Sequence, residues 1–189
     1  MPDSKLQGSR VAILATDLFE EAELIEPRKA LQEAGAETVV IAPHGGEIQA
    51  VKHDTKTRKV KVDMTLDKAR PEGFDALLLP GGAMNADALR MEKKAQEFVQ
   101  QIERERKPIA VICHGPWLLV SAGLVKDRHM TSYFTIQDDL KNAGARWTND
   151  PVVRDRNWVS SRQPSDIPDF NKYVIELFVE ARQKTRKAA

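Results

Sequence analysis

Residues 108–116 read Pro-Ile-Ala-Val-Ile-Cys-His-Gly-Pro. The first five are short, apolar and partly β-branched, which is typical of a strand buried on both faces of a parallel sheet. Gly115 permits a tight turn after this strand, and Pro116 suits the first position of a helix, where no amide hydrogen is needed. The stretch therefore predicts a strand that turns directly into a helix, with Cys113 in the turn at the end of the sheet.

Strands and helices alternate along the rest of the chain. Buried-strand patterns occupy residues 10–15, 38–42 and 74–79, and residues 152–161 read as an antiparallel hairpin. Apolar residues at helical spacing lie between these strands and again from about residue 168 onward. Such alternation predicts a doubly wound α/β sandwich with a mostly parallel sheet, whose ligands collect beyond the carboxyl ends of the strands. We expect residues 44–67 to form a peripheral β excursion, that is, short strands that lie outside the core.

The length of 189 residues suits one domain. We expect a loose extension over residues 1–9, the domain over 10–182 and a polar tail over 183–189. The N-terminal residues lack the apolar core of a signal peptide, and no apolar run is long enough to span a bilayer. We therefore expect a cytoplasmic protein that has no membrane partner.

Composition excludes several other classes of function. A net charge of +1 gives no general attraction to nucleic acid. With one cysteine the chain forms no internal disulfide. His44, His53 and His129 show no metal-ligand spacing, and no glycine-rich phosphate-binding motif occurs, so we expect neither a metal nor a cofactor.

Cys113 and its neighbours are the candidates for chemistry. The helix N-terminus after Cys113 would favour the thiolate and lower the thiol pKa from about 8.5. His114 offers a backbone amide to a developing oxyanion and an imidazole as general base. The amides of Gly81 and Gly82, which follow a buried strand, would approach a substrate oxygen. The alternatives are a small core cysteine, a surface histidine beside a cleft and a flexible glycine loop.

Four glutamates, at 20, 21, 23 and 26, cluster where the first helix begins. A favourable interaction with the helix dipole accounts for most of them. A carboxyl buried against a thiolate would differ, because it would be held protonated and would donate a hydrogen bond.

Several spaced segments carry a family resemblance: residues 19–25, 74–82, 107–116, 131–133, 138–144 and 157–162. With these segments the chain resembles the PfpI family of intracellular cysteine hydrolases. This family lies within the class I glutamine-amidotransferase-like superfamily, which includes the Parkinson-linked deglycase. The likeness covers roughly residues 10 to 180.

The resemblance implies a flavodoxin-like three-layer αβα sandwich with Cys113 as the nucleophile in a strained elbow. It implies that Glu20 contacts the thiol and stabilises the thiolate, and that His114 is the histidine partner. In PfpI-like proteins a carboxylate from a neighbouring subunit orients that histidine. Asp87, within residues 83–90, is the matching candidate here, so a homodimer or larger homo-oligomer is expected.

The function implied is that of a stress-response hydrolase in which Cys113 attacks a carbonyl. Its substrate would be a small carbonyl compound, a glycated protein or a peptide, with deglycase, glyoxalase or peptidase activity. Two non-catalytic alternatives stay open. One is a cysteine redox sensor, and the other is a stress chaperone.

Overall fold

A seven-stranded sheet forms the centre of the computed structural model, which describes residues 5–188. In spatial order its strands are β11 (Val152–Asp155), β12 (Trp158–Ser161), β8 (Ile109–Ile112), β7 (Ala76–Leu79), β1 (Arg10–Leu14), β3 (Glu37–Ala42) and β6 (Met64–Thr65). Every neighbouring pair is parallel except β11 with β12. The predicted doubly wound sheet and the 152–161 hairpin are confirmed.

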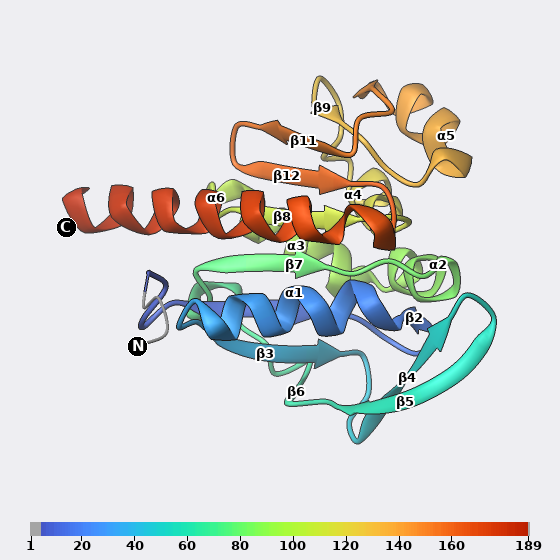
Figure 1. Ribbon diagram of the computed structural model, residues 1–189, viewed down its shortest axis with the longest axis horizontal. Coiled ribbons are helices and arrows are strands. Elements are labelled where there is room, and N and C mark those ends of the chain that lie inside the picture. Colours follow the sequence, from blue (N-terminus) through green and yellow to red (C-terminus); the bar gives the residue numbers. More distant parts are fainter. Residues whose placement is uncertain (1–4, 189) are drawn as a thin grey trace.

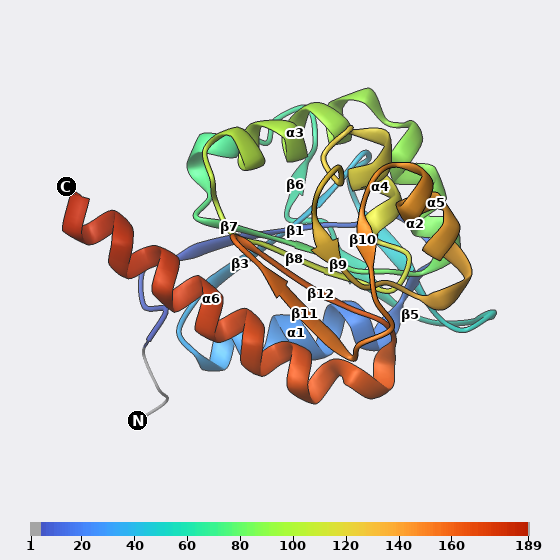
Figure 2. The same cartoon turned by 90° about the horizontal axis from the view of Figure 1, so that it is seen from above.

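Helices cover both faces of this sheet (Figure 1, Figure 2). On one face lie α1 (Glu21–Glu33) and α6 (Ile167–Ala188), and on the other α2 (Ala83–Met91), α3 (Lys93–Arg104), α4 (Pro116–Ser121) and α5 (Gln137–Asn142). Alternate residues of β1 enter two separate cores: Val11 and Ile13 join the cluster under α1 and α6, whereas Ala12 and Leu14 join the other. The result is the three-layer αβα sandwich expected of a flavodoxin-like fold.

A small second sheet projects from one end of the molecule (Figure 1). It consists of β2 (Phe19–Glu20), β4 (Glu47–Lys52) and β5 (Thr55–Lys61). This agrees with the expected excursion over residues 44–67, although β6 at its end rejoins the central sheet beside β3. The remaining short elements are β9 (His129–Met130), β10 (Arg146–Trp147) and three 3₁₀ turns, η1 (Pro71–Gly73), η2 (Phe134–Ile136) and η3 (Pro164–Asp166).

The ends of the chain differ from what their polar composition suggests. Residues 5–9, expected to be loose, pack on the domain: Leu6 is fully buried and its N–H donates to the Ala34 carbonyl. Residues 183–188, expected as a tail, continue α6. Apolar burial at one position and helix propagation from a packed segment explain these differences. Residues 1–4 and 189 lie outside the described residues.

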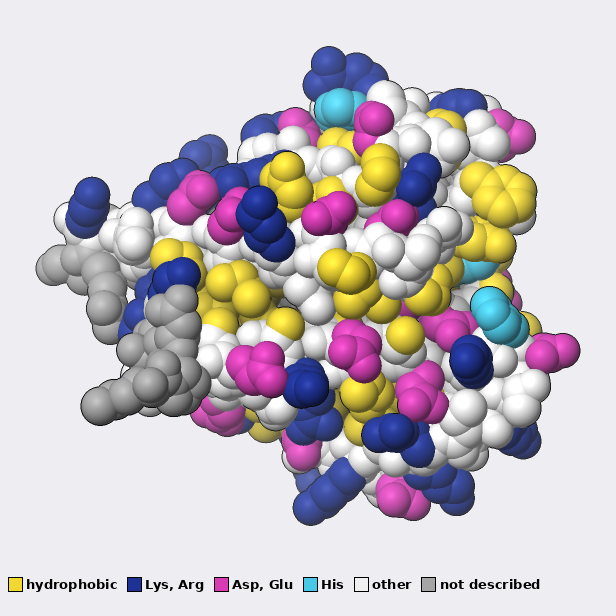
Figure 3. All heavy atoms as spheres, in the orientation of Figure 1, with side chains coloured by type: hydrophobic (Ala, Val, Ile, Leu, Met, Phe, Trp, Pro, Cys, Tyr) yellow, Lys and Arg dark blue, Asp and Glu magenta, His cyan; other side chains and the backbone are white. Residues whose placement is uncertain are grey.

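The surface mixes charges of both signs (Figure 3). Positive and negative side chains are interspersed over the face in view, in keeping with a net charge of +1. Across residues 5–188 no helix is both long and apolar enough to cross a membrane.

Candidate active site

Cys113 lies in the turn between β8 and α4, with a φ of 63°. This left-handed conformation is strained for a residue that carries a Cβ. The surroundings hold it there, because the Cys113 N–H donates to the Ser161 carbonyl and its own carbonyl accepts from the Tyr133 N–H. The side chain is 6% exposed. The strand-to-helix elbow expected from residues 108–116 is therefore present, and it presents the sulfur beyond the carboxyl ends of the strands.

The carboxyl beside this sulfur belongs to Glu23, whereas we expected Glu20. Glu23 is fully buried, and the Cys113 thiol and the Gly81 N–H are its polar neighbours. Neither carboxyl oxygen has a hydrogen bond of full geometry within the described residues. Glu20 points elsewhere, since its Oε2 accepts from the His53 N–H at 3.0 Å. The first turn of α1 thus turns Glu23, and not Glu20, toward the thiol.

Burial decides the protonation of this pair. Desolvation, and secondarily the charge of Glu20, raises the pKa of Glu23 to about 8, so the carboxyl is protonated at neutral pH. Burial, followed by the nearby Glu23, also raises the pKa of the Cys113 thiol. This is opposite to the lowering expected from the helix terminus. The N–H groups of Gly82 and His114 act in the expected direction but are outweighed by desolvation.

His114 is the proton acceptor within reach of the thiol. Its Nδ1 lies 3.2 Å from the Cys113 sulfur, and Thr135 Oγ1 lies 3.4 Å from its Nε2. The ring stacks on Tyr133, with centroids 4.9 Å apart, and meets the edge of Trp117. Burial lowers the pKa of His114, so the imidazole is neutral at pH 7 and accepts a proton. The left-handed turn at Cys113 and the stacking on Tyr133 accompany this contact between neighbouring residues, which adjacency alone does not guarantee.

Gly81 and Gly82 line the other side of the sulfur, each with a different role. The Gly82 N–H faces the thiol, whereas the Gly81 N–H faces the Glu23 carboxyl. A Cβ on Gly81 would stand 2.2 Å from Glu23 Oε2 and 2.6 Å from Cys113 Cβ. Glycine at this position is what lets Glu23 approach the thiol.

Asp87 stands apart from this cluster in the single chain. It is exposed on α2, and among the described residues it makes no hydrogen bond with His114. Two exposed methionines, Met84 and Met91, lie on the same helix. The single chain therefore brings together Cys113, His114, Glu23 and Gly82, and leaves Asp87 outside.

A cavity of about 390 Å³ opens over the sulfur. Its walls include Glu20, Glu23, His53, Gly82, Cys113, His114 and Tyr133. In the described part of the chain, no group of three or more His, Cys, Asp or Glu side chains is arranged to hold a metal ion. The arrangement fits nucleophilic attack by sulfur on a small electrophile, with amide donors near the developing charge.

The position of Glu23 had a signal in the sequence. Glu23, Pro27 and Leu31 are spaced by four residues, and all three are buried on one face of α1. Because Glu23 has the same spacing as the apolar residues of this face, it is the glutamate of the cluster that enters the core.

Comparison with known proteins agrees with this geometry. The DJ-1/PfpI family model matches residues 9–177. The chain is 42% identical to the deglycase PfpI of Pyrococcus furiosus over 168 residues, which cover 89% of this chain and 98% of the relative. It is 39% identical to general stress protein 18 of Bacillus subtilis over 171 residues, covering 90% and 98% of the two chains. Among solved structures, DJ-1beta of Drosophila melanogaster superposes with a TM-score of 0.81 at 26% identity, covering 95% of this chain and 96% of that one. The segments that carried the resemblance and the elbow that carries Cys113 lie within the matched region, and the chain belongs to the DJ-1/PfpI family.

Proposed function

We propose that the protein is a cytoplasmic cysteine-dependent hydrolase that acts on small carbonyl adducts, such as those formed by methylglyoxal. The observation that carries this proposal is the Cys113 sulfur in its strained turn, 3.2 Å from His114 Nδ1, at the floor of a cavity. A volume of about 390 Å³ suits a small carbonyl compound better than a long peptide. The deglycase name of the Pyrococcus relative supports the same class of reaction.

The reaction starts with the Cys113 thiol and the His114 imidazole both uncharged. The Cys113 thiol gives its proton to Nδ1 of His114 as the sulfur adds to the carbonyl carbon, so a C–S bond forms and the carbonyl π electrons move to oxygen. That oxygen accepts hydrogen bonds from the N–H groups of Gly82 and His114, which face the sulfur. Protonated Glu23 places no negative charge beside the reacting sulfur.

The same groups take part in the release of the products. With a methylglyoxal adduct of a thiol, the carrier thiol leaves as a free thiol, Cys113 adds to the released aldehyde carbon, and the oxyanion takes back the proton from His114 to give a hemithioacetal on Cys113. His114 then moves the proton of that carbon to the neighbouring ketone carbon, so the ketone becomes a hydroxyl group and the carbon bound to sulfur becomes the carbonyl of a lactoyl thioester. Water then attacks the thioester and gives a proton to His114, and the sulfur departs and recovers that proton. One water is consumed for each lactate and carrier thiol released, and Cys113 returns to its thiol.

The test is turnover of the methylglyoxal adduct of N-acetylcysteine, followed as lactate release. Cys113→Ala and His114→Ala should each lower kcat/KM by about 10²-fold or more, since each removes a group that moves with the reaction. His44→Ala, which removes an exposed histidine bonded to Asp17, is the matched control and should leave turnover unchanged. Turnover that persists in Cys113→Ala would refute the proposal.

We also propose that a second copy of the chain completes the site with Asp87. Two observations support this: the Asp87 carboxylate is exposed on α2, and exposed apolar side chains lie nearby in sequence at Met84 and Met91. A carboxylate at Nε2 would stabilise an imidazolium on His114, and among the described residues of a single chain the hydrogen-bond partner at Nε2 is Thr135.

Mixing two inactive variants tests this arrangement directly. Cys113→Ala and Asp87→Ala chains, unfolded together and refolded, should regain up to about a quarter of wild-type turnover, because each mixed dimer assembles one intact site. If Asp87 acted within its own chain, the mixture would stay as inactive as its components. A monomeric mass in sedimentation would also contradict the proposal.

A redox sensor is the second candidate, and Glu23 is the observation that favours it. A protonated carboxyl beside the sulfur is placed to donate a hydrogen bond to a sulfinate, the product of Cys113 oxidised by peroxide. Within this chain Cys113 is the only cysteine, so reduction of the sulfenic acid that forms before the sulfinate needs an external thiol. The sensor is favoured if adduct turnover is absent from the wild type and peroxide yields sulfinic acid equally in wild type and His114→Ala, read by mass spectrometry.

A further inference from the structure

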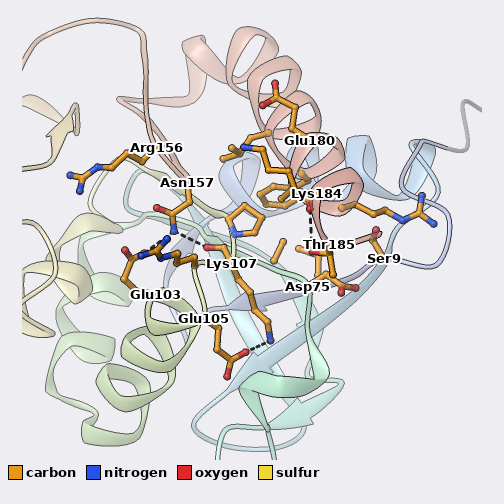
Figure 4. A pocket seen from close by; sticks show the side chains of 18 of the residues that line it. Ser9, Asp75, Glu103, Glu105, Lys107, Arg156, Asn157, Glu180, Lys184 and Thr185 are labelled. Atoms are coloured by element: carbon orange, nitrogen blue, oxygen red, sulfur yellow. Dashed lines mark hydrogen bonds and ion pairs between the residues drawn. The ribbon is translucent and has the colours of Figure 1, made fainter. Parts of the chain in front are cut away.

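A second and larger cavity, of about 1260 Å³, is shown in Figure 4. It lies at the opposite end of the sheet from Cys113, because Cys113 follows the carboxyl end of β8 and this cavity is at the amino ends of the strands. It is lined by residues at the amino ends of the parallel strands, among them Ser9, Asp75, Pro108 and Asn157. Helix α6 forms its far wall with Glu180, Lys184 and Thr185. None of the groups proposed for catalysis lines this cavity.

The wall contributed by α6 extends past the region shared with the family. The family match ends at residue 177, whereas α6 continues to Ala188. Two contacts fix this extension on the domain: the Arg182 guanidinium donates to the backbone carbonyls of Lys5 and Gln7, and Glu180 pairs with Arg154. The cavity therefore includes a wall that lies beyond the matched segment.

Positive charge is in excess in this lining, which holds eight Lys and Arg residues against four Asp and Glu residues. All four carboxylates are engaged. Glu103 pairs with Arg128, Glu105 with Lys107 and Glu180 with Arg154. The fourth, Asp75, accepts from the Arg10 N–H.

Several of the cations lack a carboxylate of their own. Arg182 is bound to backbone carbonyls only, and Arg104 and Arg106 make no side-chain hydrogen bond or ion pair among residues 5–188. Asp155 serves both Arg128 and Arg156. The charge of Arg156 and above all burial lower the pKa of Arg128. An anion in the cavity would relieve this repulsion.

Two of the cations occupy turn positions that ordinarily favour glycine or asparagine. Arg106 and Arg156 each have a φ of 54°. Left-handed backbone costs a residue with a Cβ on the order of 1 kcal/mol. The Arg106 backbone is held there by the end of α3, because its N–H donates to the Glu103 carbonyl and the Lys107 N–H donates to the Ile102 carbonyl. The Arg106 side chain makes no hydrogen bond or ion pair among the described residues and lines the cavity.

An apolar surface completes the lining, with Val11, Ala76, Leu177 and Phe178 all buried or nearly so. We propose that this cavity binds a phosphorylated organic anion, whose phosphate groups meet the arginines and whose organic part lies on the apolar surface. Guanidinium groups bind phosphate oxygens in pairs, which suits several arginines around one ligand. Binding here uses side-chain cations, so it does not need the glycine-rich loop that the sequence lacks.

The experiment is calorimetric titration of the full chain with ATP as the probe of an organic polyphosphate. We expect one ATP per chain, with affinity that falls as salt rises. Arg106→Gly/Arg156→Gly should weaken binding at least about 10-fold. The glycines suit both φ angles, so thermal unfolding should not occur at a lower temperature than in the wild type. Cys113→Ser should bind ATP as the wild type does, which separates this site from the proposed hydrolase.

Lys56→Ala/Lys59→Ala is the matched control, because it removes two exposed cations from β5, outside the cavity. It should change the affinity by less than about 2-fold, as expected of exposed charges that salt screens. Adenosine tests the role of charge and should not bind, and inorganic tripolyphosphate should bind more weakly than ATP because it lacks the organic part.

Four results would overturn the proposal. They are absence of ATP binding at millimolar concentration, equal loss of affinity in the two double variants, adenosine binding as tight as ATP, and tripolyphosphate as tight as ATP. If a second copy of the chain fills the cavity, the Arg106→Gly/Arg156→Gly variant should sediment at a lower oligomer mass than the wild type, and ATP should have no effect on that mass. This outcome would also exclude the proposal.

Discussion

Cys113 and Glu23 are neighbours in the core of the site, and the protonation state of each affects the pKa of the other. Burial raises the pKa of both groups, so at neutral pH the carboxyl holds its proton and the thiol rests beside an uncharged neighbour. The neutral His114 lies 3.2 Å from the sulfur and is placed to accept its proton. In the proposed reaction, activation of this thiol is therefore coupled to proton transfer during attack.

Replacing Glu23 by Gln should change how stability depends on pH. Between pH 4.5 and about 8 the folded wild type keeps a proton that the unfolded chain has released. Wild-type stability should therefore fall relative to Glu23→Gln as pH rises through this window, by at most on the order of 5 kcal/mol. Urea unfolding at pH 5 and pH 8.5 measures this difference. Glu26→Gln, on the exposed face of the same helix, should run parallel to the wild type.

Gly82→Ala should damage both fold and activity. Gly82 has a φ of 90°, and an added Cβ would meet the Glu20 backbone nitrogen at 2.6 Å. Displacing the Gly82 N–H removes one donor at the sulfur, for which about a 10²-fold loss in kcat/KM is expected. Gly46→Ala is the control, with a φ of 86° and nothing within 4 Å of an added Cβ. If the two variants lose activity and stability equally, the role of the close contact is refuted.

Helix α2 connects two loops of the site through one side chain. Asn85, fully buried, accepts from the Thr16 N–H at 2.7 Å and donates to the carbonyls of Pro80 and Gly81. Thr16 follows β1, and Pro80 and Gly81 follow β7, so the side chain ties together the loops that lead to Glu23 and Gly82. This helix also carries Asp87, so it positions both the amide donor and the expected carboxylate.

Asn85→Ala should loosen the site more than it changes the core. The substitution leaves the Thr16 N–H and the Pro80 carbonyl without their partner, whereas the Gly81 carbonyl keeps the Glu20 N–H, and a stability loss of about 2–5 kcal/mol follows. The alkylation rate of Cys113 by iodoacetamide should also change, because the Gly82 loop shifts. Asn142→Ala, at the end of α5, is the matched control. Unchanged alkylation in a folded Asn85→Ala protein would mean that the loops keep their positions without this side chain.

The two ends of the chain stabilise each other across the whole molecule. Arg182 reaches the carbonyls of Lys5 and Gln7, and Leu6 between them is fully buried against α1. Figure 2 shows the C-terminal half of α6 extending beyond the sheet on the side where the N-terminal segment lies. The cavity proposed for the phosphorylated anion depends on this contact, since Arg182 is part of its wall.

Arg182→Ala should release residues 5–9 without unfolding the domain. Loss of a charged donor to two carbonyls costs about 1–3 kcal/mol locally, and the Leu6 amide should exchange its hydrogen faster. Hydrogen exchange by mass spectrometry over residues 5–9 measures this. Lys184→Ala, two residues away on the same helix, should leave the exchange of that segment unchanged. Equal exchange in the two variants would show that Leu6 burial holds the segment by itself.

Local patterns in the sequence determined the layered fold and the elbow. Apolar runs such as 109–112 and the Gly115-Pro116 pair specify a buried strand, a turn and a helix from short-range physics. Adjacency did not by itself guarantee that the His114 ring would meet the Cys113 sulfur, and in the folded protein the ring stacks on Tyr133 from a distant segment. Tertiary structure alone decided which glutamate meets the thiol, because that depends on how α1 rotates against the sheet. It also decided the direction of the thiol pKa, since burial comes from packing of distant elements and outweighs the helix terminus. The cavity under α6 has the same origin, because its cations come from segments far apart in the chain and meet only when the sheet is formed.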